Sequence, residues 1–188
     1  MSGAARDARL SRLCGQLWPF APLLDAFQPA TEARVLDIGG GDGGLLRELE
    51  RRGHTGLKES IDPLAGTDAH ALPFPDATFD AVFMLRVLSH LHTPALALAE
   101  AWRVLSPGGR LIVAAHGPEH LAGMLEPGQA GAFPFVLPGM QVQPFEVFRP
   151  VVLSVESQQA LAANYGLDFR PTGALHSKLQ LTGWSLLK

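Results

Sequence analysis

Residues 35–44 are Val-Leu-Asp-Ile-Gly-Gly-Gly-Asp-Gly-Gly, and this stretch decides the fold. The apolar residues Val35, Leu36 and Ile38 predict a buried strand that leads into a glycine-rich turn and then into a helix over Leu45–Arg52. A turn of this kind lets a ligand approach the main chain closely, and the N–H groups of the following helix point toward that ligand. The sequence therefore predicts a site for a nucleotide-like ligand at the end of this strand.

An acidic residue, Asp37, stands two positions before the first glycine of the turn. The spacing Gly39-x-Gly41-x-x-Gly44 also fits the fingerprint of dinucleotide-binding domains, so the glycines alone do not identify the ligand. A carboxylate here would repel a diphosphate but would attract a ligand that carries an ammonium group. Asp37 therefore favours an ammonium-bearing ligand over a dinucleotide.

Two segments resemble one known family. Asp37-x-Gly39-x-Gly41-x-Gly43 resembles the first motif of class I S-adenosylmethionine-dependent methyltransferases. Residues 72–113 resemble the branch of that family that acts on small molecules; they begin with Leu-Pro-Phe-Pro-Asp-Ala-Thr-Phe-Asp-Ala-Val and end with Glu-Ala-Trp-Arg-Val-Leu-Ser-Pro-Gly-Gly-Arg-Leu-Ile-Val. The resemblance covers residues 33–116 well and the C-terminal third loosely. It implies a Rossmann-like fold, S-adenosyl-L-methionine as the cofactor and methyl transfer as the reaction.

Alternating strands and helices along the chain predict an α/β fold with a doubly wound, mostly parallel sheet. The family resemblance adds an antiparallel last strand, expected here in a closing pair over residues 167–172 and 179–187. Only five residues separate Asp62 from Asp68, where the family usually has a helix and a strand. A parallel crossover takes a dozen or more residues, so we expect one βα unit to be shortened or missing. The strand expected over residues 57–61 would then lie at or near the sheet edge, with a more open adenine pocket.

The 188 residues are expected to form a single domain with four parts. Residues 1–30 would form N-terminal helices over the cleft, and residues 31–116 the cofactor-binding core. Residues 117–154 contain six prolines and several large apolar side chains, which favours an irregular lid or substrate loop. Residues 155–188 would form a C-terminal helix, capped by Ser154, and the closing strands.

The resemblance and the glycine turn together assign the methionyl part of the cofactor. Asp37 is expected to act on its ammonium group. Gly39, Gly41 and Gly43 are expected to let the same part of the ligand lie against the main chain.

Four further residues are expected to bind the rest of the cofactor. Asp62, at a strand end about 20 residues beyond the turn, suits a bidentate acceptor for the two ribose hydroxyls. By the resemblance, Asp68 accepts a hydrogen bond from the adenine amino group and the Ala69 amide meets a ring nitrogen. Arg86 follows a predicted strand, where it could contact the methionyl and ribose parts or form an ion pair with Asp37 or another acid.

Histidines supply the candidates for a general base, which would take a proton from the acceptor as methyl transfer begins. His116 directly follows a predicted strand and is the first candidate, with a pH–rate limb in the imidazole range. His90 is the second, whereas His120 is expected on a helix surface. No acid or cysteine completes a metal site with these histidines, so no metal is predicted.

Composition limits the partners and the compartment. A net charge of −3 gives no general attraction for nucleic acid or anionic membranes, so a small organic acceptor is favoured. RNA remains an alternative through a stripe of Arg6, Arg9 and Arg12, which is otherwise expected to be a solvated helix face. With Cys14 as the single cysteine, no signal-like segment and no long apolar run, the cytoplasm is expected and a membrane location is not. The oligomeric state stays open.

Two alternative functions remain. The shortened segment and the lack of an unambiguous catalytic residue favour a non-catalytic scaffold or partner subunit of the same fold. A dinucleotide-dependent oxidoreductase is disfavoured by Asp37 and by the Pro-Gly-Gly-Arg segment at residues 107–110.

Overall fold

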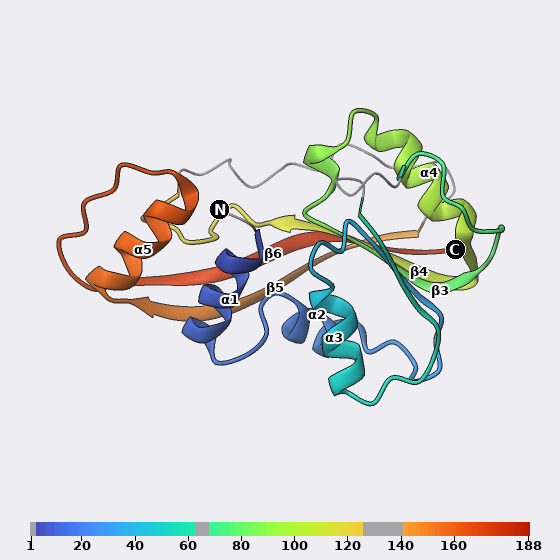
Figure 1. Ribbon diagram of the computed structural model, residues 1–188, viewed down its shortest axis with the longest axis horizontal. Helices are drawn as coiled ribbons and strands as arrows, with labels where there is room; N and C mark the ends of the chain where they lie inside the picture. Colours follow the sequence, from blue (N-terminus) through green and yellow to red (C-terminus); the bar gives the residue numbers. More distant parts are fainter. Residues whose placement is uncertain (1–2, 63–67, 126–140) are drawn as a thin grey trace.

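The computed structural model describes residues 3–62, 68–125 and 141–188, and its strands form one mixed sheet (Figure 1). The strand order is β2-β1-β3-β4-β6-β5. The strands are β1 (Val35–Ile38), β2 (Lys58–Ile61), β3 (Phe79–Leu85), β4 (Leu105–His116), β5 (Gln141–Leu153) and β6 (Leu175–Leu187). Strands β2, β1, β3 and β4 pair in parallel, whereas β6 is antiparallel to both β4 and β5. The predicted Rossmann-like, mostly parallel sheet with an antiparallel last strand is confirmed.

Helices cover both faces of the sheet. They are α1 (Gly3–Cys14), α2 (Phe20–Phe27), α3 (Gly44–Arg51), α4 (Pro94–Val104) and α5 (Val155–Tyr165), with a short 3-10 helix, η2 (Leu88–His90). Alternate residues of the central strands point to opposite faces, so Phe83 packs in the core beneath α2 and α3, and Val82 packs in the core beneath α4. Figure 1 shows α4 on the other side of the sheet from α2 and α3. The continuous apolar run in β3 follows from burial on both faces.

Strand β2 lies at one edge of the sheet, and the chain passes from it to β3 without a further strand among the described residues. The expected loss of one βα unit is therefore confirmed. Because β1 and β3 pair directly with each other, the loss affects only the edge of the sheet beyond β2 and leaves the central strands intact.

The expectation of an irregular loop over 117–154 is wrong for its last part. Residues Gln141–Leu153 form strand β5, which pairs with β6 along its whole length. Pro144 and Pro150 lie in this strand; a proline is tolerated at a sheet edge because alternate N–H groups there point away from the neighbouring strand. Residues 126–140 of the expected lid lie outside the described residues.

The predicted closing pair is also corrected. Residues 167–172 form no strand; β6 begins at Leu175 and takes β5 as its partner. The helix before it is as expected: Ser157 N–H donates to Ser154 Oγ at 3.1 Å, and Gly166, with φ +68°, ends the helix in the left-handed conformation.

Helix α1 packs against β5 and α5, and α2 packs against α3 and β5. Across residues 3–62, 68–125 and 141–188, no helix is both long enough and apolar enough to cross a membrane.

Candidate functional site

The candidate site is built where the parallel strands end. Asp37 lies in β1, Asp62 follows β2, Arg86 follows β3 and His116 ends β4. Because these four strands run in the same direction, their carboxyl ends share one edge of the sheet, which is where open α/β sheets bind ligands.

The glycine turn between β1 and α3 needs glycine for two reasons. Gly39, Gly41 and Gly43 have φ values of +82°, +53° and +77°, which side chains rarely allow. A Cβ on Gly39 would also stand 2.5 Å from Cγ2 of Val87, whereas nothing lies within 4 Å of the same position on Gly41. The main chain at Gly41 is therefore open to a ligand.

Sequence reasoning missed a further glycine of this turn, Gly40. A Cβ there would lie 2.1 Å from Ser60 Oγ and 2.7 Å from Asp37 Oδ2. Gly40 is therefore required so that the carboxyl group of Asp37 can lie against the turn. The run of three glycines was the available signal.

Asp37 is a buried acid without a charge partner bonded to it. Its residue is 1 % exposed, and its Oδ2 has no hydrogen-bond partner among the described residues. Burial raises the pKa of Asp37 to about 7; the nearby Arg86 opposes this shift, whereas Asp42 and Asp62 add to it. A cation placed beside Asp37 would restore its ionised form.

The side chain of Arg86 forms an ion pair with Asp7 and not with Asp37. Its Nη1 donates to Asp7 Oδ1 at 2.7 Å and its Nη2 donates to Asp7 Oδ2 at 2.5 Å. The side chains of Arg86 and Asp7 are 18 % and 14 % exposed. The sequence left open an ion pair with Asp37 or with another acid beside a contact with the cofactor; of the two ion pairs, the structure shows the second. Asp7 and Arg86 are 79 positions apart in the sequence, which left no local signal for this contact.

Asp62, Asp68 and Ala69 lie toward the β2 side of the site. Asp62 stands near enough to Asp37 to act on its charge. Asp68 accepts a hydrogen bond from the His70 N–H at 2.8 Å and lies 2.7 Å from His70 Nδ1, and these bonds lower its pKa. Ala69 is 1 % exposed and packs in the core beneath α4.

The two candidate bases differ in their surroundings. His90 is exposed on η2, whereas the two ring nitrogens of His116 are buried and have no hydrogen-bond partner among the described residues. The rings of His116 and His120 stack with centroids 4.0 Å apart. Burial, His120 and the cations Arg86 and Arg6 hold the pKa of His116 well below its ordinary value, so its ring is neutral at pH 7.

The expectation that His120 lies on a helix surface is wrong, because His120 is 3 % exposed. The Gln180 N–H donates to His120 Nδ1 at 3.0 Å, so in the neutral ring the proton sits on Nε2, 3.3 Å from the Tyr165 hydroxyl. Burial lowers the pKa of His120 to about 3. His120 is thus a fixed, neutral support for the ring of His116.

The arginine stripe on α1 is not the solvated face that was expected. Arg12 is exposed, but Arg6 and Arg9 are partly buried. The Arg6 guanidinium lies over the ring of Tyr165, 5.3 Å from its centroid. Only one of the three cations is therefore presented freely to a large anionic partner.

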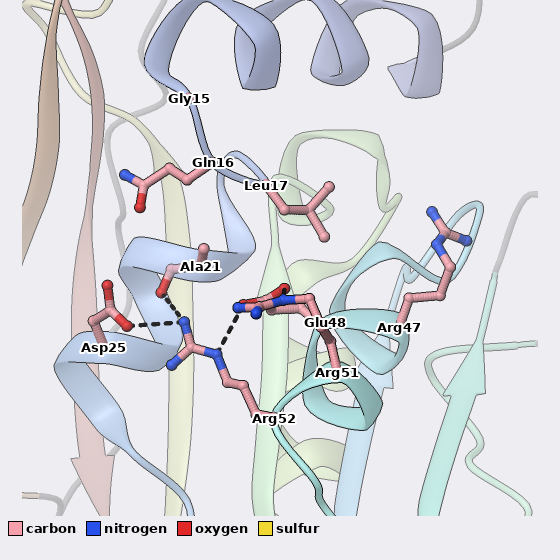
Figure 2. Close-up of a pocket in the computed structure, with 9 residues that line it drawn as sticks. All are labelled: Gly15, Gln16, Leu17, Ala21, Asp25, Arg47, Glu48, Arg51 and Arg52. Atoms are coloured by element: carbon pink, nitrogen blue, oxygen red, sulfur yellow. Dashed lines mark hydrogen bonds and ion pairs between the residues drawn. The ribbon is translucent and has the colours of Figure 1, made fainter.

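A cavity of about 580 Å³ lies elsewhere, between α3 and the segment joining α1 to α2 (Figure 2). Its arginines are paired within the chain: Glu48 accepts from Arg51 at 2.6 Å and from Arg52 at 2.8 Å, and Arg52 also reaches Asp25. None of the predicted site residues lines it. The ion pairs that line this cavity connect α2 to the end of α3.

Comparison with known proteins shows which family the central part of the chain resembles. Residues 36–113 match a family model described as a methyltransferase domain. The structure of an S-adenosylmethionine-dependent methyltransferase from Aquifex aeolicus superposes over the whole of both chains with a TM-score of 0.57 and 18% identity, which shows the shared fold. Residues 36–113 are therefore similar to the methyltransferase-domain family, and the chain shares the fold of an S-adenosylmethionine-dependent methyltransferase. The cofactor of this family is S-adenosyl-L-methionine.

The curated relatives that the chain matches are matched over only part of their length. A ubiquinone/menaquinone biosynthesis C-methyltransferase from Ruegeria sp. (strain TM1040) is 35% identical over 121 residues, covering 52% of this chain and 48% of the relative. A demethylmenaquinone methyltransferase from Renibacterium salmoninarum is 37% identical over 112 residues, covering 49% and 45%. The chain therefore spans about half the length of the curated relatives it matches.

The residues at this edge of the sheet fit the cofactor of the matched family. Asp37 supplies an unpartnered, buried carboxyl group for an ammonium, and Gly41 supplies open main chain beside it. Asp62 directly follows β2, at the position where an acid can accept hydrogen bonds from the hydroxyls of a ribose.

Proposed function

We propose that this protein binds S-adenosyl-L-methionine and transfers its methyl group to a small organic acceptor. The observation that carries the proposal is the buried Oδ2 of Asp37, which has no hydrogen-bond partner among the described residues and lies against the glycine turn. Such a group is costly to bury alone. A ligand ammonium beside it would offset that cost, which explains why an acid is kept there.

Different residues of the chain would bind different parts of the cofactor. Asp37 holds the ammonium, Gly39, Gly41 and Gly43 allow close approach of the methionyl part, and Asp62 accepts the ribose hydroxyls. Asp68 and the Ala69 amide take the adenine ring. Because the guanidinium of Arg86 is bonded to Asp7, we assign the contact of Arg86 with the methionyl part to its main chain.

When bound, S-adenosyl-L-methionine supplies a methyl group made electrophilic by its sulfonium. The chain then has to position the acceptor, exclude water and receive one proton from the acceptor's hydroxyl or amine. We assign that proton to a ring nitrogen of His116, which is neutral and unpartnered. His90, exposed on η2, is assigned a contact with the acceptor from the solvent side.

The acceptor is proposed to be small, since only Arg12 of the arginine stripe is freely exposed. The matched relatives are named for ubiquinone, menaquinone and demethylmenaquinone, so a quinone-type ring is the first acceptor to test.

Isothermal titration with S-adenosylhomocysteine tests the cofactor. We expect measurable binding by the wild-type chain, loss of binding in Asp37→Ala and Gly39→Val, and unchanged binding in Glu50→Ala, an exposed position on α3. An absence of heat at millimolar ligand, with a folded wild-type protein, contradicts the proposal. Binding without product across a panel of labelled-methyl acceptors would instead favour the non-catalytic scaffold.

A further inference from the structure

Two carboxyl groups compete for one arginine at the carboxyl edge of the sheet. Arg86 acts electrostatically on both Asp7 and Asp37, yet within the described part of the chain its guanidinium bonds to Asp7 and not to Asp37. Asp37 is left with an unpartnered oxygen. In the proposed function, this oxygen is where the ligand ammonium binds. Whether that position is open to a cation therefore depends on which of the two carboxyl groups the Arg86 guanidinium binds.

The main-chain conformation of Arg86 does not by itself determine which carboxyl group its guanidinium binds. Arg86 sits in the left-handed conformation, with φ +59°, and its N–H donates to Ala114 O at 2.7 Å, which fixes the backbone at the end of β3. The long side chain beyond it has several rotatable bonds. Its direction is set by the paired bonds to Asp7, which comes from α1, a separate element.

Helix α1 is firmly placed, so Asp7 is a rigid anchor. Leu10 of α1 is fully buried in the core, and Ser11 Oγ accepts a hydrogen bond from the Trp18 N–H at 2.9 Å. The same hydroxyl donates to the Asp7 carbonyl at 2.6 Å. Asp7 therefore presents its carboxylate to Arg86 from a fixed position.

We propose that Asp7 is a positioning residue for cofactor binding: it holds the guanidinium of Arg86 away from Asp37 and so keeps the Asp37 carboxyl group available to the ligand ammonium. This inference rests on the proposed function. Without Asp7, the guanidinium of Arg86 turns to Asp37, the other carboxyl group that acts on it, and occupies the position that the ammonium needs. Asp7 thus governs affinity without touching the ligand.

The test compares two ligands that share the adenosine part. S-adenosylhomocysteine carries the ammonium group, whereas 5′-methylthioadenosine lacks it. In Asp7→Asn we expect the affinity for S-adenosylhomocysteine to fall at least tenfold and the affinity for 5′-methylthioadenosine to stay within about twofold of wild type. Asp7→Glu should restore much of the loss, and Arg12→Gln, an exposed position on the same helix, should change neither affinity.

A double variant separates this role from simple anchoring of α1. In Asp7→Asn/Arg86→Met no guanidinium is left to occupy Asp37, so S-adenosylhomocysteine should bind more tightly than in Asp7→Asn alone. Equal losses for both ligands, or a double variant as weak as the single one, would overturn the inference. If wild type binds neither ligand, it is the proposed function that fails.

Discussion

At the scale of single residues, the charge of Asp37 links the fold to the ligand. The pKa of Asp37 is raised from 3.8 to about 7 by burial, so the folded chain keeps a proton that the unfolded chain loses between these values. Folding stability should therefore fall as the pH rises through this window, by about 1.4 kcal/mol per pH unit from this group. Above pH 7 its contribution becomes constant.

Denaturant unfolding of wild type and Asp37→Asn at several pH values checks the sign of this effect. The difference in free energy of unfolding should grow in favour of Asp37→Asn from pH 4 to pH 7 and then level off. Binding of S-adenosylhomocysteine in the same window should release a proton, visible as a dependence of the titration heat on the buffer, whereas 5′-methylthioadenosine should release none. Parallel pH profiles for the two proteins would refute this assignment.

His116 gives a second prediction at this scale. His116→Ala should lower turnover about a hundredfold and leave the affinity for S-adenosylhomocysteine unchanged, since the side chain would touch only the acceptor. His176→Ala, at an exposed position on β6, serves as the control. Because the pKa of His116 lies well below its ordinary value, the rate should show no limb near pH 6.5 from this residue, contrary to the expectation from sequence. A normal rate with a lower melting temperature would mean that His116 only fills space.

At the scale of the elements, the sequence was informative where local physics decides the structure. The buried run of β3, the cap at Ser154 and the glycine turn each depend on residues close in the chain. Strand β5 could not be recognised, because its prolines are typical of loops and only its place at the sheet edge makes them acceptable. The buried position of His120 likewise depends on Gln180 and Tyr165, which are distant in sequence.

The attachment of α3 to α2 leads to a prediction about stability. The side chain of Glu48 is fully buried and accepts from both Arg51 and Arg52, as Figure 2 shows. Glu48→Gln removes the charge and leaves these guanidiniums without their shared partner, so we expect a loss of about 2 kcal/mol in the free energy of unfolding. Glu50→Gln, exposed on the same helix, should cost almost nothing. Urea denaturation measures both, and similar costs at the two positions would contradict the interpretation.

At the scale of the whole molecule, the candidate site draws on parts of the chain that are far apart. Asp37 and the glycine turn could be recognised from the sequence because one continuous segment contains them. The partner of Arg86 could not, since Asp7 lies on a distant part of the chain and contacts Arg86 only through the tertiary fold. If Asp7 acts as proposed, helix α1 is a component of the site, and the core of residues 31–116 does not by itself hold every group on which cofactor binding depends.

The short link from Asp62 to Asp68 has a consequence for chemical labelling. With β2 as the outermost strand on its side, the described chain places no further layer beside the expected adenine position, and the side chain of Asp68 is 62 % exposed. Cofactor analogues enlarged at the adenine amino group, which a walled pocket would reject, should therefore bind here with affinities close to that of the natural compound. If such an analogue also carries a tagged alkyl group on its sulfonium in place of the methyl group, the chain would transfer that tag to its acceptor in a mixture of stricter methyltransferases and so reveal the acceptor.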